Sequence, residues 1–332
     1  MDERIGLAHG NGGRLMRELI EEVFFKQLPG AGLSKALDAA AIPIQITTPM
    51  MTTDGFTVQP LVFPGGSLGS LAAHGVLNDL AVAGALPRWL TLGAILEEGL
   101  EVSLLQQLVG DFARAVQEAD AVVVAGDTKV VPRGHGGGAY FTVAGLGEQT
   151  RAGLGFEAIQ PGDVVVVSGT VGDHGTAVML AREEFALRGE ILSDCGSVLS
   201  LCQTAYAYQS LRFMRDPTRG GLATVMHEIH QATGLGSHLV ATQIPIAQET
   251  KGVCEILGFD PLYLACEGRV VAVIGRDEAQ DLVQNWQSMQ EGQDAAIVGR
   301  ISHDVDGVVL ETEVGGLRIL EELEDDPLPR IC

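Results

Sequence analysis

The chain has 332 residues, of which 46% are hydrophobic, and it carries a formal net charge of −22 at pH 7. A strongly negative protein repels nucleic acid and anionic membranes, so we expect neither as a partner. The longest apolar runs, such as Val164–Val167, are far too short to cross a bilayer, and the first residues lack the features of a secretory signal. We therefore expect a soluble, cytoplasmic protein.

The length exceeds the usual size of one hydrophobic core, which favours two α/β lobes. In the first half, apolar residues recur at helical spacing after Gly12 and Gly13. The patterns that follow predict strands over 42–48 and 51–62, a helix over 68–85, a strand over 89–96, a helix over 103–118, and strands over 121–125 and 139–147.

A domain boundary is predicted within 149–162, a stretch that is rich in glycine and ends in Pro161-Gly162. We expect an N-terminal domain over 1–150 and a C-terminal α/β domain over 151–312. In the latter, helices around 176–185, 198–211, 222–232 and 279–289 alternate with strands. The last residues, EELEDDPLPRIC, are acidic and contain two prolines, so 313–332 is predicted to be a mobile tail.

The common phosphate-binding loops are absent, because the sequence has neither GxxxxGK[ST] nor a GxGxxG between a strand and a helix. Aspartates instead stand beside small residues at predicted turns and helix ends: Asp54, Asp79, Asp127 and Asp216. Carboxylates are ligands for Mg²⁺, and an acidic protein needs such cations to accept a triphosphate. Each aspartate taken singly is also typical of an ordinary turn or cap.

The five cysteines form no CxxC pair, so neither a zinc site nor a disulfide framework is indicated. Four of them lie in apolar surroundings and are predicted to be buried. The fifth, Cys332, ends the chain on an arm whose last twelve residues could reach on the order of 35–40 Å. A tethered thiolate is a good acceptor for an acyl or carbamoyl group, although a terminal cysteine can also be accidental.

Seven motifs together carry a resemblance that spans almost the whole chain: HGNGG, LNDLAVAGA, GDTKVV, VGDHG, RDPTRGGL, CEGR and the terminal PRIC. They resemble the hydrogenase maturation family HypE. That family belongs to a superfamily with aminoimidazole ribonucleotide (AIR) synthetase, selenophosphate synthetase and thiamine-monophosphate kinase. The resemblance implies a two-lobed, PurM-like α/β fold, a homodimer joined through its N-terminal sheets, and the use of ATP.

The resemblance also implies a reaction. HypF would place a carbamoyl group on Cys332, and ATP-dependent dehydration would turn this S-carboxamide into a thiocyanate. The cyanide would pass to iron carried by the HypC–HypD complex, for the active site of [NiFe]-hydrogenase.

Site residues follow by matching motifs. ATP and Mg²⁺ would be held by Asp54, Asp79, Asp127 and Asp216, with further nucleotide contacts from Asn78, Gly126, Thr128 and Arg219. Lys129 would stabilise developing charge, and Glu267 would remove the amide protons.

Two other interpretations of the function remain. A selenophosphate synthetase shares the aspartate motifs but typically carries a reactive cysteine or selenocysteine near its start, and here no cysteine precedes Cys195. A non-enzymatic scaffold would use the acidic surface and the tail only to dock partners. ATP hydrolysis that depends on a modified tail would separate an enzyme from a scaffold.

Overall fold

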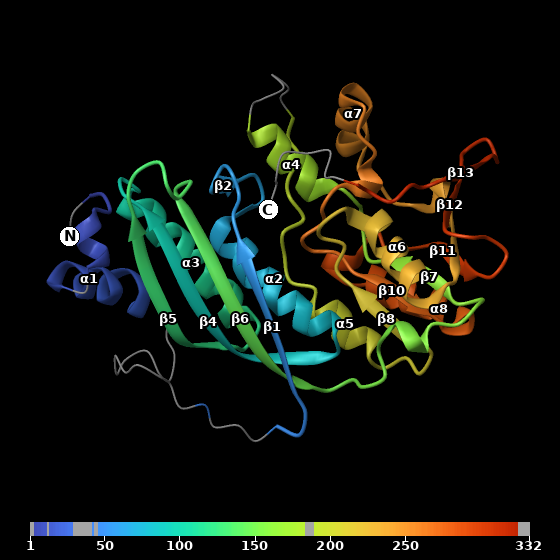
Figure 1. Cartoon of the computed structure of the whole chain (residues 1–332). Coiled ribbons are helices and arrows are strands. Elements are labelled where there is room, and N and C mark those ends of the chain that lie inside the picture. Colours follow the sequence, from blue (N-terminus) through green and yellow to red (C-terminus); the bar gives the residue numbers. More distant parts are fainter. Residues whose placement is uncertain (1–2, 12, 29–41, 43–45, 183–188, 325–332) are drawn as a thin grey trace. The chain divides into compact units, whose positions relative to one another are not determined.

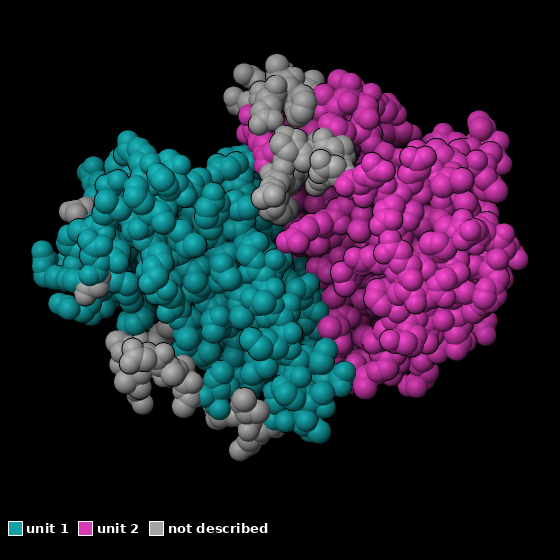
Figure 2. Space-filling model, in the orientation of Figure 1, with its two compact units in different colours: residues 1–80, 85–149, 332 teal, residues 81–84, 150–331 magenta. Residues whose placement is uncertain are grey.

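The computed structural model describes residues 3–11, 13–28, 42, 46–182 and 189–324. These residues form two compact units (Figure 2). The first unit contains the described residues up to Leu80 together with Ala85–Gln149, and the second contains Ala81–Gly84 together with the described residues from Thr150 onward. Within the described ranges, no helix combines the length and the apolar character that crossing a bilayer requires.

The first unit is built on a four-stranded sheet in the order β1 (Pro49–Phe56), β6 (Ala139–Gln149), β4 (Ala85–Glu97) and β5 (Val122–Val131) (Figure 1). β4 and β5 are parallel, and the chain between them contains helix α3 (Val102–Glu118). The other neighbouring strands are antiparallel. A short hairpin of β2 (Val62–Phe63) and β3 (Gly66–Ser67) precedes helix α2 (Leu68–Val82).

One face of this sheet is covered by α2 and α3. Residues of β6 alternate between buried and partly exposed, as expected for a strand with one covered face. Phe141 of β6 packs edge-to-face on Phe112 of α3, with ring centroids 6.5 Å apart. Gly145 of β6 lies so close to Val76 of α2 that a Cβ would come within 2.5 Å of it. The other face is the open face, and it carries Met51, Ile95 and Leu146, among others.

The amino-terminal residues form η1 (Leu7–Gly10), α1 (Arg14–Leu19) and the π-helical η2 (Ile20–Phe25). Gly10 approaches Val130 so closely that a Cβ would meet its backbone nitrogen at 3.0 Å. This helical segment therefore packs beside β5, at one edge of the sheet.

The second unit contains a seven-stranded sheet in the order β13-β12-β9-β11-β7-β10-β8. Its strands are β7 (Val164–Val167), β8 (Leu211–Arg215), β9 (Gly236–Val240), β10 (Val271–Ile274), β11 (Ala296–Ser302), β12 (Val308–Glu311) and β13 (Leu317–Ile319). Its helices are α4 (Asp173–Ala181), α5 (Leu199–Ala205), α6 (Gly221–Thr233), α7 (Gln248–Leu257) and α8 (Arg276–Gln287). Short 3-10 turns are η4 (Phe156–Ala158), η5 (Ala241–Gln243), η6 (Pro261–Tyr263) and η7 (Gln290–Gly292).

Helices cover both faces of this second sheet. Alternate residues of β7 belong to two separate apolar clusters, Val165 with Leu222 of α6 and Val166 with Leu201 of α5. Trp286 of α8 joins the second cluster and donates its indole N–H to the Leu201 carbonyl at 2.9 Å. The all-valine β7 is thus buried on both sides, which explains why its sequence shows no alternation.

The structure corrects several expected elements. β5 continues to Val131, so the segment from Gly126 to Lys129 lies in a strand and not in a turn. The helix expected over 198–211 ends at Ala205, and α7 was not expected. β13 and the buried Leu320 lie within 313–332, so ordered structure extends into the segment predicted as a tail.

Candidate functional site

Three of the predicted site residues, Asp54, Asn78 and Asp79, lie where β1 meets α2. The strand alternation turns Thr52, Asp54 and Phe56 toward the helix-covered face. Thr52 Oγ1 donates to Asp79 Oδ2 at 2.8 Å, and Asn78 is buried. The structure therefore brings the expected β1 and α2 aspartates to the same edge of the first sheet.

The GDTK motif occupies β5, at the other edge of the same sheet. The pairing register aligns Asp54, Val143, Leu92 and Gly126 in one row across the four strands. Three strand spacings therefore separate the two groups, about 14 Å. Asp127 and Lys129 follow Gly126 in alternation and so project from the open face, with Lys129 Nζ 3.4 Å from Asp127 Oδ2. Within one chain, Asp54 and Asp127 are at opposite edges and on opposite faces.

Asp216 and Arg219 lie in the second unit, in the loop between β8 and α6. Asp216 is buried, and its carbonyl accepts the Thr218 N–H at 3.0 Å. Gly221, which starts α6, has φ of +59°, and a Cβ there would meet the Leu264 carbonyl oxygen at 2.5 Å. Glycine is therefore required for the loop to turn into the helix. Burial, together with the nearby Asp216 charge, raises the pKa of the Cys202 thiol.

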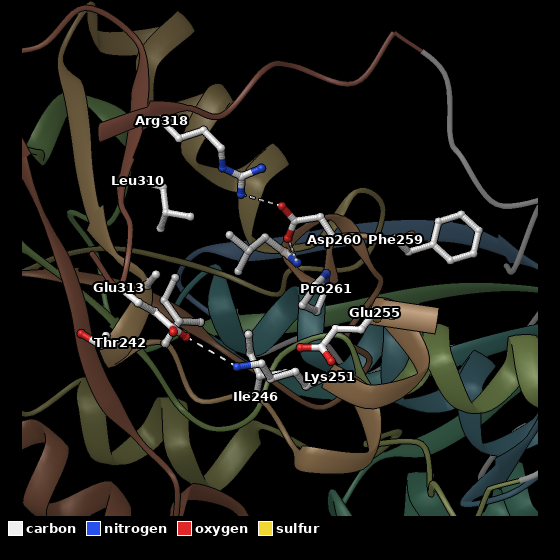
Figure 3. Close-up of a pocket in the computed structure, with 14 residues that line it drawn as sticks. Thr242, Ile246, Lys251, Glu255, Phe259, Asp260, Pro261, Leu310, Glu313 and Arg318 are labelled. Carbon is white, nitrogen blue, oxygen red and sulfur yellow. Dashed lines mark hydrogen bonds and ion pairs between the residues drawn. The ribbon is translucent and has the colours of Figure 1, made fainter. Parts of the chain in front are cut away.

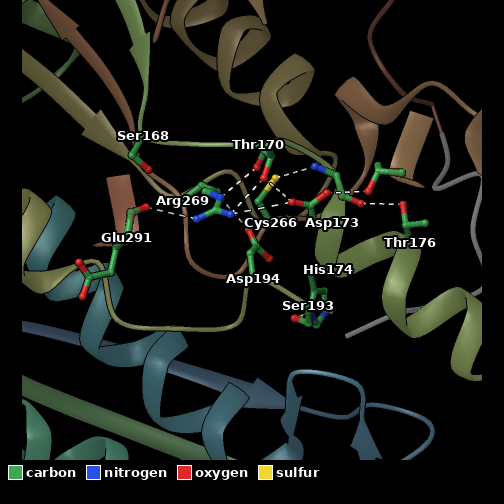
Figure 4. Close-up of polar contacts among 12 residues, drawn as sticks. Ser168, Thr170, Asp173, His174, Thr176, Ser193, Asp194, Cys266, Arg269 and Glu291 are labelled. Carbon is green, nitrogen blue, oxygen red and sulfur yellow. Dashed lines mark hydrogen bonds and ion pairs between the residues drawn. The ribbon is translucent and has the colours of Figure 1, made fainter. Parts of the chain in front are cut away.

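Glu267 is also in the second unit and is only 5% exposed. Its backbone joins a polar network around Arg269 and Asp194, and Figure 4 shows these two residues with their partners. The Glu267 N–H donates to Asp194 Oδ1 at 3.1 Å, and Arg269 Nε lies 3.5 Å from Asp194 Oδ2. Arg269 Nε also donates to the Thr170 carbonyl at 3.0 Å. The predicted base therefore sits on a loop that is tied down by charged partners.

Two members of this network, Asp194 and Thr170, were not expected from the sequence. Asp194 lies outside any helix or strand, and burial raises its pKa to about 6. Another member of the network, Asp173, belongs to the VGDHG motif, which the sequence had already indicated. Its Oδ1 accepts a hydrogen bond from Thr250 Oγ1 at 2.6 Å. In the same motif, His174 Nδ1 lies 2.8 Å from Ser193 Oγ, and burial lowers the pKa of this histidine to about 3. The imidazole is therefore neutral.

Neither of two cavities in the described part of the chain is lined by the full set of predicted site residues. The larger, about 380 Å³, is in the second unit beside α7 and β12 (Figure 3). Its rim holds two ion pairs, Lys251–Glu313 at 3.5 Å and Arg318–Asp260 at 2.7 Å. The predicted site residues that the structure describes do not line it. The smaller, about 80 Å³, lies against Gly126–Thr128 under the apolar side of α1 and η2, and it is too small for a nucleotide.

The cysteines differ from the prediction at one position. Cys202, Cys254 and Cys266 are buried as expected, but Cys195 is only partly buried. Cys332 lies outside the described residues. Over the ranges that are described, no three His, Cys, Asp or Glu side chains gather to hold a metal ion. A cation at the aspartates would therefore need further oxygen ligands, such as those of a triphosphate.

Comparisons with known proteins cover both units of the chain. The N-terminal domain family of AIR synthase related proteins matches residues 37–149, and the C-terminal domain family matches residues 160–311. Carbamoyl dehydratase HypE of Rhodobacter capsulatus is 43% identical over 100% of this chain and 99% of its own.

Among solved structures, a hydrogenase maturation protein HypE in complex with ATP is 35% identical, with a TM-score of 0.92 over 98% of this chain and 99% of its own. A chain of a HypE–HypF complex is 39% identical, with a TM-score of 0.80 over 92% of this chain and 99% of its own.

Proposed function

Because this chain belongs to the HypE family of carbamoyl dehydratases, we propose that it dehydrates a carbamoyl group on its own Cys332 with the use of ATP. The S-carboxamide becomes a thiocyanate, whose cyanide serves [NiFe]-hydrogenase maturation. The observation that carries this proposal is the similarity to a carbamoyl dehydratase, which extends over both units and the full length of both chains.

The terminal cysteine is the best candidate for the carrier thiol. Burial raises the pKa of Cys254 to about 11 and raises that of Cys202 and Cys266 well above the ordinary value. Such thiols contain very little thiolate at neutral pH and react slowly. Among the cysteines that the structure describes, only Cys195 has some exposure. These observations support Cys332 as the acceptor.

ATP is the proposed co-substrate, and Mg²⁺ is the metal ion proposed to bind with it. The relative solved with ATP supports the nucleotide. The residue types support the cation, because carboxylates are ligands for Mg²⁺. Asp54 and Asp79 lie at one edge of the first sheet, where Thr52 bonds to Asp79, while Asp127 lies at the other edge and Asp216 in the second unit. Asn78, Gly126, Thr128 and Arg219 are the proposed further contacts to the nucleotide.

A homodimer would complete this set. Asp54 and Asp127 are at opposite edges of the sheet, so one chain cannot offer both to the same ion. The open face carries exposed apolar side chains, including Met51 at 73% and Ile95 at 38%. We propose that two copies associate through this face, so that β5 of one copy lies at the β1 edge of the other. Asp54 points to the covered face, so Asp127 of the second copy would approach it around this edge strand. Burial of exposed apolar area favours such an association.

The proposed chemistry divides between two side chains. ATP supplies the phosphoryl group that the carboxamide oxygen attacks, which turns that oxygen into a leaving group as phosphate. Lys129 stabilises the negative charge that develops on the transferred group. Glu267 accepts the amide protons, both of which must leave before the C≡N bond can form. The sulfur–carbon bond stays intact, and water is formally removed.

The proposed partners are HypF, which donates the carbamoyl group, and the HypC–HypD complex, which accepts the cyanide. A solved complex between HypF and a HypE chain 39% identical to this one supports the first partner. The second follows from the family resemblance and from the need for an iron acceptor of the cyanide.

Mass spectrometry tests the proposal directly. Incubation with HypF, carbamoyl phosphate and ATP should add a carbamoyl mass to the C-terminal peptide and then remove one water. Cys332→Ala should abolish both changes, whereas the matched control Cys195→Ala should retain them. Dehydration that persisted in Cys332→Ala would refute the carrier role. A stable adduct that never lost water would favour a docking scaffold.

A further inference from the structure

We propose that Asp194 is a positioning residue for the dehydration step, because its carboxylate fixes the backbone of the Cys266–Arg269 loop that carries Glu267. The inference rests on the proposed role of Glu267 as a base. It assigns a function to a buried carboxylate that lies outside the sequence motifs.

The Asp194 carboxylate faces two successive amides of that loop. The Glu267 N–H donates to Oδ1 at 3.1 Å, and the Gly268 N–H helps to lower the pKa of the carboxylate, against the effect of burial. The Asp194 side chain is 1% exposed, so these bonds are shielded from water. A charged acceptor that takes a backbone N–H in a buried site, beside a guanidinium, gives strong, directional anchoring.

Arg269 holds the other end of the loop. Its Nε lies 3.5 Å from Asp194 Oδ2, and its Nη2 lies 3.9 Å from Asp173 Oδ2 and donates to Thr170 Oγ1 at 3.1 Å. A Cβ at Gly169 would come within 2.9 Å of the guanidinium carbon. Arg269 therefore has little freedom to move, and it fixes Asp194 in turn (Figure 4).

The remaining loop residues are fixed as well. The Gly172 N–H donates to Cys266 Sγ at 3.2 Å. A Cβ at Gly268 would meet the Asp194 carbonyl oxygen at 1.9 Å, so only glycine fits there. Every residue from Cys266 to Arg269 thus contacts either Asp194 or the start of α4. Glu267 is placed by its neighbours on both sides.

Asp194 is itself held in place by its flanking residues. Ser193 Oγ accepts the Cys195 N–H at 2.9 Å and lies 2.8 Å from His174 Nδ1. The neutral His174 is fully buried in α4. The segment from Ser193 to Cys195 is therefore anchored to the same helix start as the Glu267 loop, and the two segments form one rigid support.

Replacing the Asp194 carboxylate by an amide should weaken its hold on the Glu267 loop. An ionised Asp accepts at both oxygens, whereas Asn accepts at one and presents N–H groups at the other. In Asp194→Asn, the amide would face either the loop N–H groups or the Arg269 guanidinium, all of which are donors. We expect the loop to shift, and a misplacement of about 1 Å can slow a reaction about 100-fold.

The first experiment compares Asp194→Asn with Asp163→Asn in the full chain. Asp163 is a matched control, because it is also buried, accepts the Gln160 N–H at 2.8 Å and lies 3.6 Å from Arg212 Nε. Both variants should accept the carbamoyl group from HypF. Only Asp194→Asn should dehydrate it about 100-fold more slowly. Equal rates in the two variants would overturn the proposal.

A double-mutant cycle separates positioning from general damage. If Asp194 acts through Glu267, Asp194→Asn should have no further effect on dehydration in a Glu267→Gln background. A similar slowing in both backgrounds would make Asp194 merely structural and overturn the proposal. Normal dehydration by Glu267→Gln alone would instead refute the proposed base, so the two failures are distinguishable.

Hydrogen exchange gives a readout that does not depend on activity. The Glu267 and Gly268 amides should be protected in the wild type and exchange faster in Asp194→Asn, while amides of β7 stay protected. If Asp194→Asn does not fold, Arg269→Lys tests the same support, since lysine cannot contact Thr170 and Asp194 together. Unchanged exchange at both amides in a folded variant would overturn the proposal.

Discussion

Lys129 and Glu267, the two side chains that the proposed chemistry uses, occupy opposite surroundings. Lys129 is 67% exposed on the open face of the first sheet, and its ion pair with Asp127 contributes little to stability. Glu267 is buried on a loop fixed by charged partners. The first side chain can therefore be removed without disturbing the fold, whereas the second is part of a packed network.

Lys129→Ala should leave the free energy of unfolding within about 0.5 kcal/mol of the wild type. It should nevertheless leave the carbamoyl adduct undehydrated, since the developing charge loses its stabilising ammonium group. Urea denaturation and mass spectrometry of the C-terminal peptide check the two outcomes. Lys251→Ala is the matched control, because Lys251 is another exposed lysine in an ion pair. Normal dehydration by Lys129→Ala would remove this residue from the chemistry.

His74 makes the first unit sensitive to acid. Burial lowers the pKa of this α2 histidine from 6.5 to about 4, and its Nδ1 has no hydrogen-bond partner among the described residues. Because the folded pKa is depressed, the contribution to stability is present above pH 6.5 and is lost as the pH falls. Between pH 7 and pH 5 the unfolding free energy should drop by about 2 kcal/mol from this residue.

His74→Leu should remove that part of the pH dependence, because leucine does not titrate. Urea unfolding at pH 7 and pH 5 measures this pH dependence of the unfolding free energy. The fluorescence of Trp89 reports on the first unit once Trp286, the other tryptophan, is replaced by phenylalanine. A variant whose stability still fell as steeply as that of the wild type would show that His74 is not the cause.

The sequence predicted the helix that carries two of the proposed site residues, but it did not predict the surroundings of others. The apolar spacing around Asn78 and Asp79 indicated a helix, and α2 contains both residues. Gly126-Asp127 resembles a turn locally, but pairing with β4 extends the strand through it. Asp194 was missed because nothing in its own segment predicts burial. Its environment depends on Arg269 and Glu267, which are distant in the sequence.

At the scale of elements, α2 and α3 approach each other closely enough to bring backbone atoms into contact. A Cβ at Gly69 of α2 would lie 1.8 Å from the Leu108 carbonyl oxygen and 3.1 Å from the Phe112 nitrogen. Backbone atoms cannot yield as a flexible side chain can. The contact between these helices, and with it the covered face of the first sheet, therefore depends on glycine at this position.

Gly69→Ala should destabilise the first unit by about 2 kcal/mol or more, since the helices must separate to admit the methyl group. Gly252→Ala is the control, because Gly252 lies within helix α7 and nothing stands within 4 Å of its Cβ position. It should stabilise the second unit by about 0.5–1 kcal/mol, the helix preference of alanine over glycine. Thermal unfolding of both variants provides the test, and equal effects would contradict the packing argument.

The boundaries of helices and strands were predicted well where the apolar residues recur at a clear period. α3 spans Val102–Glu118, against an expected helix over 103–118, because its apolar residues follow one regular stripe. α7 was not predicted because its sequence, QETKGVCEIL, is mostly polar and contains a glycine. The long β4, Ala85–Glu97, begins four residues before the expected strand, where pairing with β6 overrides the local proline and arginine.

At the scale of the whole molecule, the proposed dimer can be tested on the open face of the first sheet. Ile95→Lys should give a folded monomer, because a buried, unpaired ammonium group at the interface is unfavourable. Ile256→Lys, on the exposed surface of α7, should leave the assembly unchanged. Sedimentation velocity distinguishes the two. Dimers that persisted in Ile95→Lys would exclude this face as the interface.

The monomeric variant should also lose dehydration, since Asp54 and Asp127 of one chain lie about 14 Å apart by strand spacing. Retained activity in a proven monomer would contradict a site shared between chains. The sequence indicates the aspartates as candidates, but the distance between them depends on strand order. That order results from the pairing of distant segments, which local patterns do not encode.

The burial of three cysteines has a practical consequence. Cys202, Cys254 and Cys266 have raised pKa values and are buried, so they should resist alkylation in the native state. A maleimide dye added at neutral pH should then spare these three cysteines, which leaves Cys195 and Cys332 as the positions for labelling. In a Cys195→Ala background, such a dye would label Cys332 alone, and the labelled chain should no longer accept a carbamoyl group because its acceptor sulfur is blocked.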